Sequence, residues 1–415
     1  MPTDEEMNPT TPEVEQAPPP PPELPLAWAY LENGAVVESG EAVCVIGERG
    51  LNLKCKAGPP FLIAYAEIAA IKDRAAVNLQ LTMRDGTAYE LSGMARLRDT
   101  LRTTLLEKWT ALNRKQALAE ETLIERFSGK ARLHEESLER CGVGVYATAV
   151  VLDFEDGRVR RIPLVFSGRP EKGDHAFVFT PPGERWVVSH LGREADRFRA
   201  AVALAINKLE EEAQKRLSGL CPSLPPMKAR GLAKHFLDGL AVPLRAVRES
   251  FPALERALVM ELEQAGLLES WDAITALGSR QQARVGQKAA LKASSGLYRW
   301  FFVPVIRGER AAVVMEASGE GSAGRATYVF RVADGPQAVE AAMDSLNYAL
   351  VMVNFRREPI YLPDEQMRNP NSQHYLRSME RVPALAALRR DFLGRVFHTS
   401  PEAWRQGLED VLGRM

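Results

Sequence analysis

Four basic residues recur at every fourth position of one short stretch: Arg280, Arg284, Lys288 and Lys292. On an α-helix this spacing aligns side chains along one face. The sequence has no acidic residue from Ala273 to Gly308, so no neighbour in the chain neutralises the four charges. We therefore predict a helix that carries a basic stripe on one face.

The basic stretch runs on into an aromatic segment, in which Arg299 precedes Trp300. A basic helix face beside exposed aromatic rings attracts an anionic surface, either lipid headgroups or phosphates. The alternative is a solvated helix face that leads into a strand with its aromatic rings in the core. The candidate binding residues are the four residues of the stripe together with Arg299 and Trp300.

A glycine pattern at Gly319, Gly321 and Gly324 has the spacing of a dinucleotide-binding loop. That function requires a strand before the loop and a helix after it, because the helix N-terminus holds the pyrophosphate. Residues 325–332 read RATYVFRV, which is a strand pattern. The sequence therefore predicts a hairpin loop here and no cofactor.

The cysteine and histidine residues form no recognisable catalytic or metal-binding pattern. Cys141, Asp153, His175 and His190 could be drawn as a nucleophilic set, but only spatial contact would make them one. None of the four cysteines has a partner at zinc-ligand spacing. We predict no catalytic residue, no metal site and no enzyme activity.

Composition is that of an ordinary globular protein, with 46% hydrophobic and 26% charged residues. The net charge of −1 makes nucleic acid an unexpected partner. Cys44 and Cys55 lie in neighbouring predicted strands, where a disulfide is conceivable; reduced thiols in a cytoplasmic protein are the preferred interpretation. No signal peptide is evident, and no apolar run reaches the ~20 residues needed to span a bilayer.

The segment from Phe61 to Trp109 shows how the elements are arranged. Alternating strands flank an Asp85-Gly86 turn, which is a strong hairpin signal. Apolar residues then recur at every fourth position on one face of a helix: Leu97, Leu101, Leu105 and Trp109. The order is that of antiparallel strands closed by one C-terminal helix.

This pattern resembles bacterial pleckstrin-homology-like (PH-like) modules, in which a bent sheet is closed by one helix. The matching segments are AYAEIAAI at 64–71, NLQLTMRDGTAYEL at 78–91 and the helix from Arg96. The resemblance covers residues 27–112, about a fifth of the chain. It implies a module that binds partner proteins, through loops or through a groove beside the closing helix.

The same order of strands followed by a helix recurs twice more, without a shared residue motif. We predict an α+β protein in six parts: a disordered acidic, proline-rich tail at 1–26; the PH-like module at 27–115; a helical linker and second β module at 116–218; a helical insert at 219–295; a third β unit with a closing helix at 296–362; and a C-terminal helical segment at 363–415. The polar stretch 115–140 is expected to be helical.

The sequence thus predicts a non-enzymatic cytoplasmic binding or scaffold protein. Peripheral membrane or anionic-ligand binding through residues 280–307 is the first alternative, and an enzyme of unrecognised family is the second. Liposome co-sedimentation would distinguish the scaffold function from peripheral membrane binding. A deep pocket lined by convergent ionisable groups would favour the enzyme.

Overall fold

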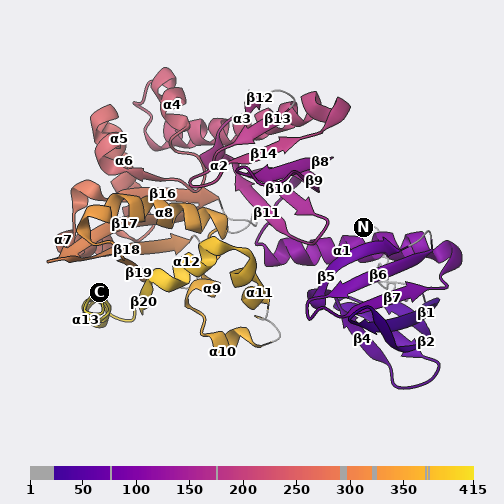
Figure 1. Ribbon diagram of the computed structural model, residues 1–415. Helices are drawn as coiled ribbons and strands as arrows, with labels where there is room; N and C mark the ends of the chain where they lie inside the picture. Colours follow the sequence, from indigo (N-terminus) through magenta and orange to yellow (C-terminus); the bar gives the residue numbers. More distant parts are fainter. Residues whose placement is uncertain are drawn as a thin grey trace, which may run out of the picture. The chain divides into compact units, whose positions relative to one another are not determined.

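The computed structural model describes residues 23–74, 77–173, 176–289, 297–319, 325–369, 372 and 374–415. The fold is α+β, and its sheets are antiparallel and curled (Figure 1). The chain divides into two compact units, residues 1–109 and 110–415. No described helix is both long enough and apolar enough to cross a membrane.

The first unit contains a seven-stranded sheet with the order β4-β3-β2-β1-β7-β6-β5. Its strands are β1 (Glu23–Glu32), β2 (Ala35–Ile46), β3 (Gly50–Cys55), β4 (Phe61–Ala64), β5 (Ile68–Arg74), β6 (Asn78–Met83) and β7 (Ala88–Ser92). The predicted turns form, since Asn33 and Gly34 between β1 and β2 and Gly86 between β6 and β7 all have positive φ. Helix α1 (Arg98–Gln116) follows β7.

The tail was predicted to extend to residue 26, but β1 begins at Glu23. Leu24 and Leu26 are buried and continue the alternation that leads to Trp28, so the strand period includes them. Residues 1–22 lie outside the described residues.

Helix α1 closes the first sheet through one apolar face, as predicted. Leu101 and Leu105 are fully buried and Trp109 is 3% exposed, whereas Leu97 precedes the helix and is 40% exposed. The Trp109 indole N–H donates to the carbonyl of Ile68 at the start of β5 over 3.1 Å. The helix is therefore anchored to the sheet by packing and by one hydrogen bond.

Truncation of Leu105 is expected to destabilise the first unit. Leu105→Ala removes a fully buried side chain and leaves a cavity, at a cost of about 2–5 kcal/mol in the free energy of unfolding. Urea unfolding, with amide exchange followed over residues 23–109, measures the effect. Leu97→Ala is the control and should change stability by less than about 0.5 kcal/mol. Equal effects of the two substitutions would contradict this packing.

The second unit opens with a sheet of the same topology, in the order β11-β10-β9-β8-β14-β13-β12. Its strands are β8 (Leu123–Leu133), β9 (Glu139–Tyr146), β10 (Ala149–Phe154), β11 (Val159–Pro163), β12 (Glu171–Gly173), β13 (Ala176–Phe179) and β14 (Trp186–Ser189). The short helix α2 (Leu164–Ser167) follows β11, and the long helix α3 (Ala195–Leu220) follows β14.

The two sheets also correspond in register. In the first, Ile46 pairs with Leu51 and Leu51 with Ile63. In the second, the residues 99 positions later, Val145, Val150 and Ile162, pair in the same way. All these residues are buried, so the repeat lies in the core positions.

The junction with the closing helix repeats as well, at a spacing of 97 residues. Ser92, Arg96 and Asp99 correspond to Ser189, Arg193 and Asp196, and both junctions have positive φ at two positions: Gly93 and Ala95 in the first, His190 and Gly192 in the second. Leu101 and Phe198 then enter the core as the first fully buried residues of the two helices. We conclude that residues 23–109 and 123–220 contain two copies of one helix-closed module.

The prediction of a helix over residues 115–140 is wrong beyond Gln116, because β8 occupies Leu123–Leu133. In β8, Phe127 and Ala131 are buried while most other residues are at least partly exposed. Because so few residues of β8 are apolar, its sequence alone resembles that of a polar helix.

Four helices follow the second module: α4 (Pro226–Ala233), α5 (Leu244–Ser250), α6 (Pro252–Gln264) and α7 (Leu268–Leu277). They were predicted as a separate insert at 219–295. Instead, they share one hydrophobic core with α3, the second sheet and one face of the third sheet. The predicted insert also contains two strands of the third sheet, β15 (Ala241–Pro243) and β16 (Arg284–Ala289). Its predicted end at residue 295 therefore lies beyond the start of that sheet.

The third sheet has the order β15-β16-β17-β18-β19-β20. Strands β17 (Leu297–Arg307), β18 (Arg310–Gly319) and β19 (Ala326–Val332) agree with the sequence prediction, whereas β20 (Phe392–Phe397) was missed. The remaining helices are α8 (Val339–Met352), α9 (Glu358–Tyr361), α10 (Asp364–Met367), α11 (His374–Arg381), α12 (Pro383–Asp391) and α13 (Pro401–Leu412). As predicted, Ser400 caps α13 and accepts a hydrogen bond from the Ala403 amide over 3.1 Å.

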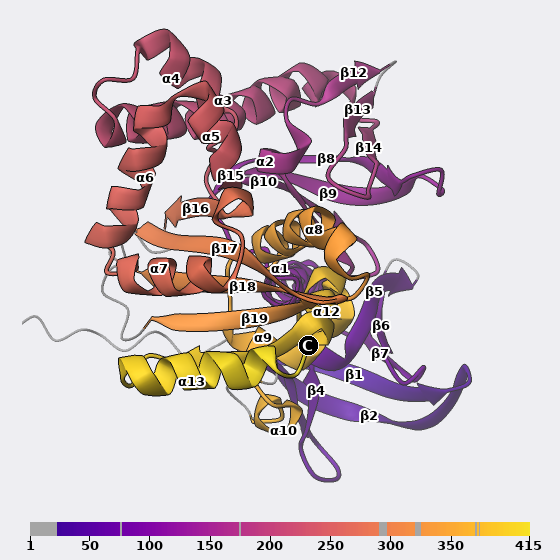
Figure 2. The same ribbon diagram turned by 90° about the vertical axis from the view of Figure 1, so that its left-hand side faces the viewer.

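Helices cover both faces of the third sheet. Figure 2 shows α7 and α13 across one face of β17–β19, and Phe301 and Val303 belong to the core on that side. Trp300 and Phe302 belong to the core shared with α8 and α12. Strand β17 is therefore buried on both faces, which explains its continuous apolar run.

Candidate functional site

The predicted basic helix does not form. Arg280 lies in a 3₁₀ turn, residues Arg284–Ala289 form strand β16, and Lys292 lies outside the described residues. Arg284 and Lys288 are only 5% and 6% exposed. The Arg284 guanidinium pairs with Asp344 and, at 2.7 Å, with Glu340, and Lys288 lies 3.4 Å from Asp238. These two charges are neutralised by acids distant in the sequence.

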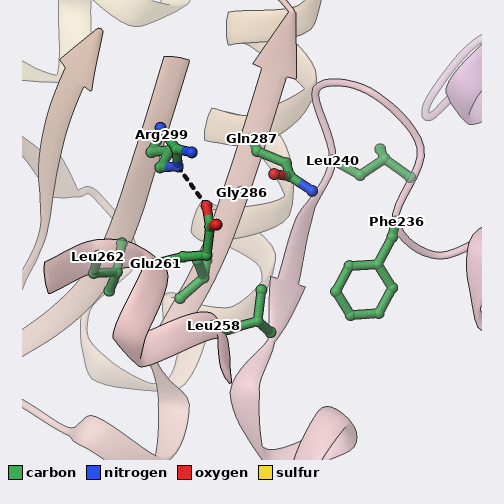
Figure 3. A pocket seen from close by; sticks show the side chains of 9 residues that line it. Phe236, Leu240, Leu258, Glu261, Leu262, Gly286, Gln287 and Arg299 are labelled. Atoms are coloured by element: carbon green, nitrogen blue, oxygen red, sulfur yellow. Dashed lines mark hydrogen bonds and ion pairs between the residues drawn. The ribbon is translucent and has the colours of Figure 1, made fainter. Parts of the chain in front are cut away.

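Arg299 and Trp300 lie on β17, and neither belongs to an exposed stripe. Trp300 is 1% exposed. Arg299 donates from Nε to Glu261 of α6 at 2.7 Å, across the pocket shown in Figure 3. The other labelled side chains around this pocket are mainly apolar. Its volume of about 20 Å³ accommodates little more than one water molecule.

The possible nucleophilic set is not assembled either. Asp153 accepts from Arg114 Nε at 2.9 Å, and His190 Nδ1 lies 2.9 Å from the Ser189 hydroxyl. Burial, together with the nearby carboxylates of Asp153 and Glu139, raises the pKa of the Cys141 thiol to about 12, which disfavours the reactive thiolate. His175 lies outside the described residues.

Cys44 and Cys55 are both free thiols. Cys44 pairs with Leu53 and Cys55 with Ala42 in the β2–β3 ladder, so the two cysteines are not opposite one another. Burial raises the pKa of Cys44 to about 12. Cys44 therefore acts as a core residue, whereas Cys55 is partly exposed.

The glycine-rich segment lies between two strands, as predicted. Strand β18 ends at Gly319 and pairs with β19, which begins at Ala326. Residues 320–324 lie outside the described residues. A strand rather than a helix follows the glycines, so the helix N-terminus that a dinucleotide site needs is not supplied.

A buried polar cluster joins α13 to the third sheet. Glu316 and Thr327 are fully buried, and His398 Nε2 lies 2.8 Å from Glu316. Thr327 donates to Glu316 and accepts from the Trp404 indole N–H over 2.7 Å. Glu316 and Thr327 form their hydrogen bonds within the cluster, so we interpret it as a structural contact. Across the described ranges, no group of three or more His, Cys, Asp or Glu side chains is arranged to hold a metal.

The best candidate site is a cleft of about 370 Å³ at one end of the third sheet. Its lining comes from the end of β16, from β17 and β19, and from the segment after α8: Lys288, Ala289, Tyr298, Tyr328, Asn354, Phe355, Arg356, Arg357, Glu358 and Tyr361. The volume is within the range of small-molecule sites. Aromatic rings and cationic side chains predominate in it.

Asn354 is the most informative residue of this cleft. It is 3% exposed, yet neither its amide nitrogen nor its amide oxygen has a hydrogen-bond partner among the described residues. An unpaired buried polar group costs about 1–3 kcal/mol. A donor and an acceptor are therefore available together for a ligand.

The backbone at this point is strained. Asn354 and Phe355 both adopt left-handed conformations, with φ of 53° and 56°. Asn tolerates this conformation, but for Phe it is unfavourable. The Phe355 ring packs on Trp300 with ring centroids 4.3 Å apart, which holds the conformation. Such strain is common where a structure presents residues to a ligand.

Arg357 supplies an uncompensated positive charge. Its guanidinium lies over the rings of Tyr298 and Tyr328, 6.0 and 5.5 Å from their centroids. No ion pair involves it among the described residues, and its Nη1 is buried without a partner. By contrast, Arg356 pairs with Glu120 at 2.6 Å. Burial raises the pKa of Tyr328, although Arg357 and Arg395 oppose the increase.

Of the five predicted binding residues that the structure describes, Lys288 alone lines this cleft. Asn354 and Arg357 were missed. The available signal was the segment Asn-Phe-Arg-Arg, which begins one residue after the end of a largely apolar helix. Comparison of the chain with protein-family models and with curated proteins finds no match.

Proposed function

We propose that this chain is a non-enzymatic binding protein whose cleft beside the third sheet holds a small anionic ligand. The observation that carries the proposal is the pairing of an unsatisfied buried amide, Asn354, with an unpaired guanidinium, Arg357. The lining contains no nucleophile beside a general base among its described residues, since Glu358 already accepts from the Tyr375 hydroxyl over 2.9 Å.

The cleft specifies the chemistry of its ligand. Arg357 requires an anionic acceptor, either a carboxylate or a phosphate, because guanidinium N–H groups match both geometries. Asn354 requires a donor and an acceptor side by side, as on a nucleobase edge or a peptide amide. A mononucleotide and a peptide with a free C-terminal carboxylate both satisfy this description.

Isothermal titration of the full chain with AMP, GMP, inorganic phosphate and the dipeptide Gly-Gly tests the proposal. Arg357→Met keeps an apolar stem over the tyrosines but removes the charge, and we expect it to weaken binding at least ~10-fold. Asn354→Asp keeps a side chain that tolerates the left-handed backbone, but it repels an anion and should have a similar effect.

Arg331→Met is the matched control, because Arg331 is exposed on β19 and does not line this cleft. It should bind the same ligand as the wild type does. The proposal fails if the wild type binds none of the four probes, or if Arg357→Met and Arg331→Met have equal affinities. Unfolding midpoints of all variants establish that the fold is intact.

The wider role remains part of the same proposal. The repeated helix-closed topology supports PH-like modules that bind partner proteins, a step that rests on fold analogy. Free buried thiols support a cytoplasmic location. Binding to an anionic lipid surface through residues 280–307 is less well supported, since Arg284 and Lys288 are buried and paired.

A further inference from the structure

The inner face of the first sheet ends in a cluster of aromatic rings. Phe61 stacks on Tyr89 with centroids 5.8 Å apart, Tyr89 contacts Tyr30 at 5.2 Å, and Phe61 contacts Trp28 at 4.9 Å. Tyr30, Phe61 and Tyr89 are all partly exposed. We name this cluster of four rings the mouth of the first module.

Three carboxylates surround the mouth. The Tyr30 hydroxyl donates to Glu32 over 3.0 Å, Glu38 lies opposite Tyr30 in the β1–β2 ladder, and Asp85 lies in the β6–β7 turn. The pKa of Tyr89 is raised by burial and then by nearby negative groups, including Asp85 and Glu38. None of the three carboxylates forms a salt bridge within the described part of the chain. The mouth thus combines aromatic faces with unpaired negative charge.

The second module shows what occupies the equivalent position there. Leu53 pairs with Phe61 in the first module, and Leu152 pairs with Arg160 in the second, 99 positions later. Likewise, Leu81 pairs with Tyr89 in the first module, and Phe179 pairs with Trp186 at the corresponding position of the second. By strand register, Arg160 therefore corresponds to Phe61, and Trp186 corresponds to Tyr89.

Arg160 is also enclosed by its own chain. Its Nη1 donates over 3.1 Å to the carbonyl of Arg381, at the end of α11. Burial and the nearby Arg158 lower the pKa of Arg160, while Glu184, Asp156 and Glu136 favour its charged form. At the strand position of Phe61, the second module therefore has an internal guanidinium near three carboxylates, whereas the first module has an aromatic ring.

We propose that the mouth of the first module binds an arginine-bearing segment of a partner protein. Guanidinium groups stack on aromatic faces and pair with carboxylates, so they match both features of the mouth. The acidic N-terminal segment is a poor occupant, since residues 1–22 carry five acids and no Lys or Arg, and they join β1 at its opposite end from Tyr30. The proposal extends the partner-binding role above but uses no residue of the cleft.

Fluorescence anisotropy with labelled peptides tests this inference on the full chain. The probes are GSGRGRGSG, the same peptide with both arginines replaced by lysine, and the same peptide with both replaced by glutamine. We expect the arginine peptide to bind most tightly and the glutamine peptide not to bind. Affinity should fall as salt rises, because the rim charges are exposed.

Two variants make the test specific. The double substitution Glu32→Gln and Glu38→Gln keeps side-chain shape and should weaken binding of the arginine peptide about 10-fold. Phe61→Arg copies the second module by supplying an internal guanidinium, and it should abolish binding. Glu107→Gln, on the exposed face of α1, is the control and should bind as the wild type does.

The outcomes separate this inference from the proposed function. Equal affinities for the arginine and glutamine peptides, or equal affinities of the wild type and the double glutamine variant, would overturn it. Anion binding in the cleft should persist in all these variants, and Arg357→Met should retain peptide binding. Loss of both activities in one variant, with an unchanged unfolding midpoint, would also contradict the assignment of two separate sites.

Discussion

Replacement of Arg161 by methionine is expected to lower the free energy of unfolding by about 3–5 kcal/mol at neutral pH. Arg161 and Glu121 form an ion pair of 2.6 Å, and their side chains are only 3% and 4% exposed. Arg161 also donates to the Thr148 hydroxyl and, over 2.9 Å, to the carbonyl of Val351 at the end of α8. The substitution leaves the Glu121 charge buried without its main partner.

The loss of unfolding free energy caused by Arg161→Met should be largest at neutral pH and smaller in acid. Burial opposes ionisation of Glu121, but Arg161 and the Thr148 hydroxyl more than offset it and hold its pKa below the ordinary value. In the wild type, this stabilisation is complete above the unfolded pKa of about 4.3 and is lost as pH falls through the folded pKa. In Arg161→Met, burial raises the pKa of Glu121, so protonation relieves the penalty. The difference between the two proteins should therefore shrink as pH falls.

Urea unfolding of the wild type and Arg161→Met between pH 4 and 8 measures this difference. Arg158→Met is the control, because its pairs with Glu139 and Asp156 are half-exposed and contribute at most about 1 kcal/mol. The double substitution Glu121→Gln with Arg161→Met should recover part of the loss, since no unpaired charge remains. A constant difference across the pH range would show that packing, rather than charge, dominates at this position.

Local signals in the sequence predicted many of the elements. The Asn33-Gly34 and Asp85-Gly86 turns, the closing face of α1 and the Ser400 cap each depend on a few adjacent residues, and all are present. Such features are determined by backbone preferences within one turn. No packing partner needs to be known to recognise them.

The prediction of a basic helix in the stretch from Arg280 was wrong for a physical reason. A spacing of four residues places side chains on one face of a helix, but it does so on a strand too, because four is a multiple of the strand period of two. The decisive partners of Arg284, Glu340 and Asp344, lie more than fifty residues away on α8. Exposure and charge balance therefore could not be inferred from the neighbouring sequence.

The repeat of the two modules and the cleft beside the third sheet could not be predicted from the sequence for similar reasons. The two modules share mainly buried positions, such as Ile63 and Ile162, where several apolar residues serve equally well. Their common register becomes visible only when strand pairing is known. The cleft combines residues from β16, β17, β19 and the segment after α8, so no single stretch contains its pattern.

Addition of one methyl group at Gly286 is expected to cost about 1–3 kcal/mol of stability. Gly286 of β16 lies directly opposite Trp300 of β17. A Cβ atom there would come within 2.3 to 2.8 Å of three atoms of the indole. Trp300 is 1% exposed and packs on Phe355, so its ring has no free space into which to move.

The same substitution should reach the cleft, because Trp300 supports Phe355, whose left-handed backbone adjoins Asn354. We expect Gly286→Ala to lower the unfolding midpoint and also to weaken binding of the cleft ligand. Gly231→Ala in α4 is the matched control: nothing lies within 4 Å of its added Cβ, and alanine favours a helix by up to about 1 kcal/mol. Weaker binding by Gly286→Ala, with full affinity in Gly231→Ala, would show that Trp300 positions the strained segment. Full affinity in a destabilised Gly286→Ala would mean that Asn354 is held by other contacts.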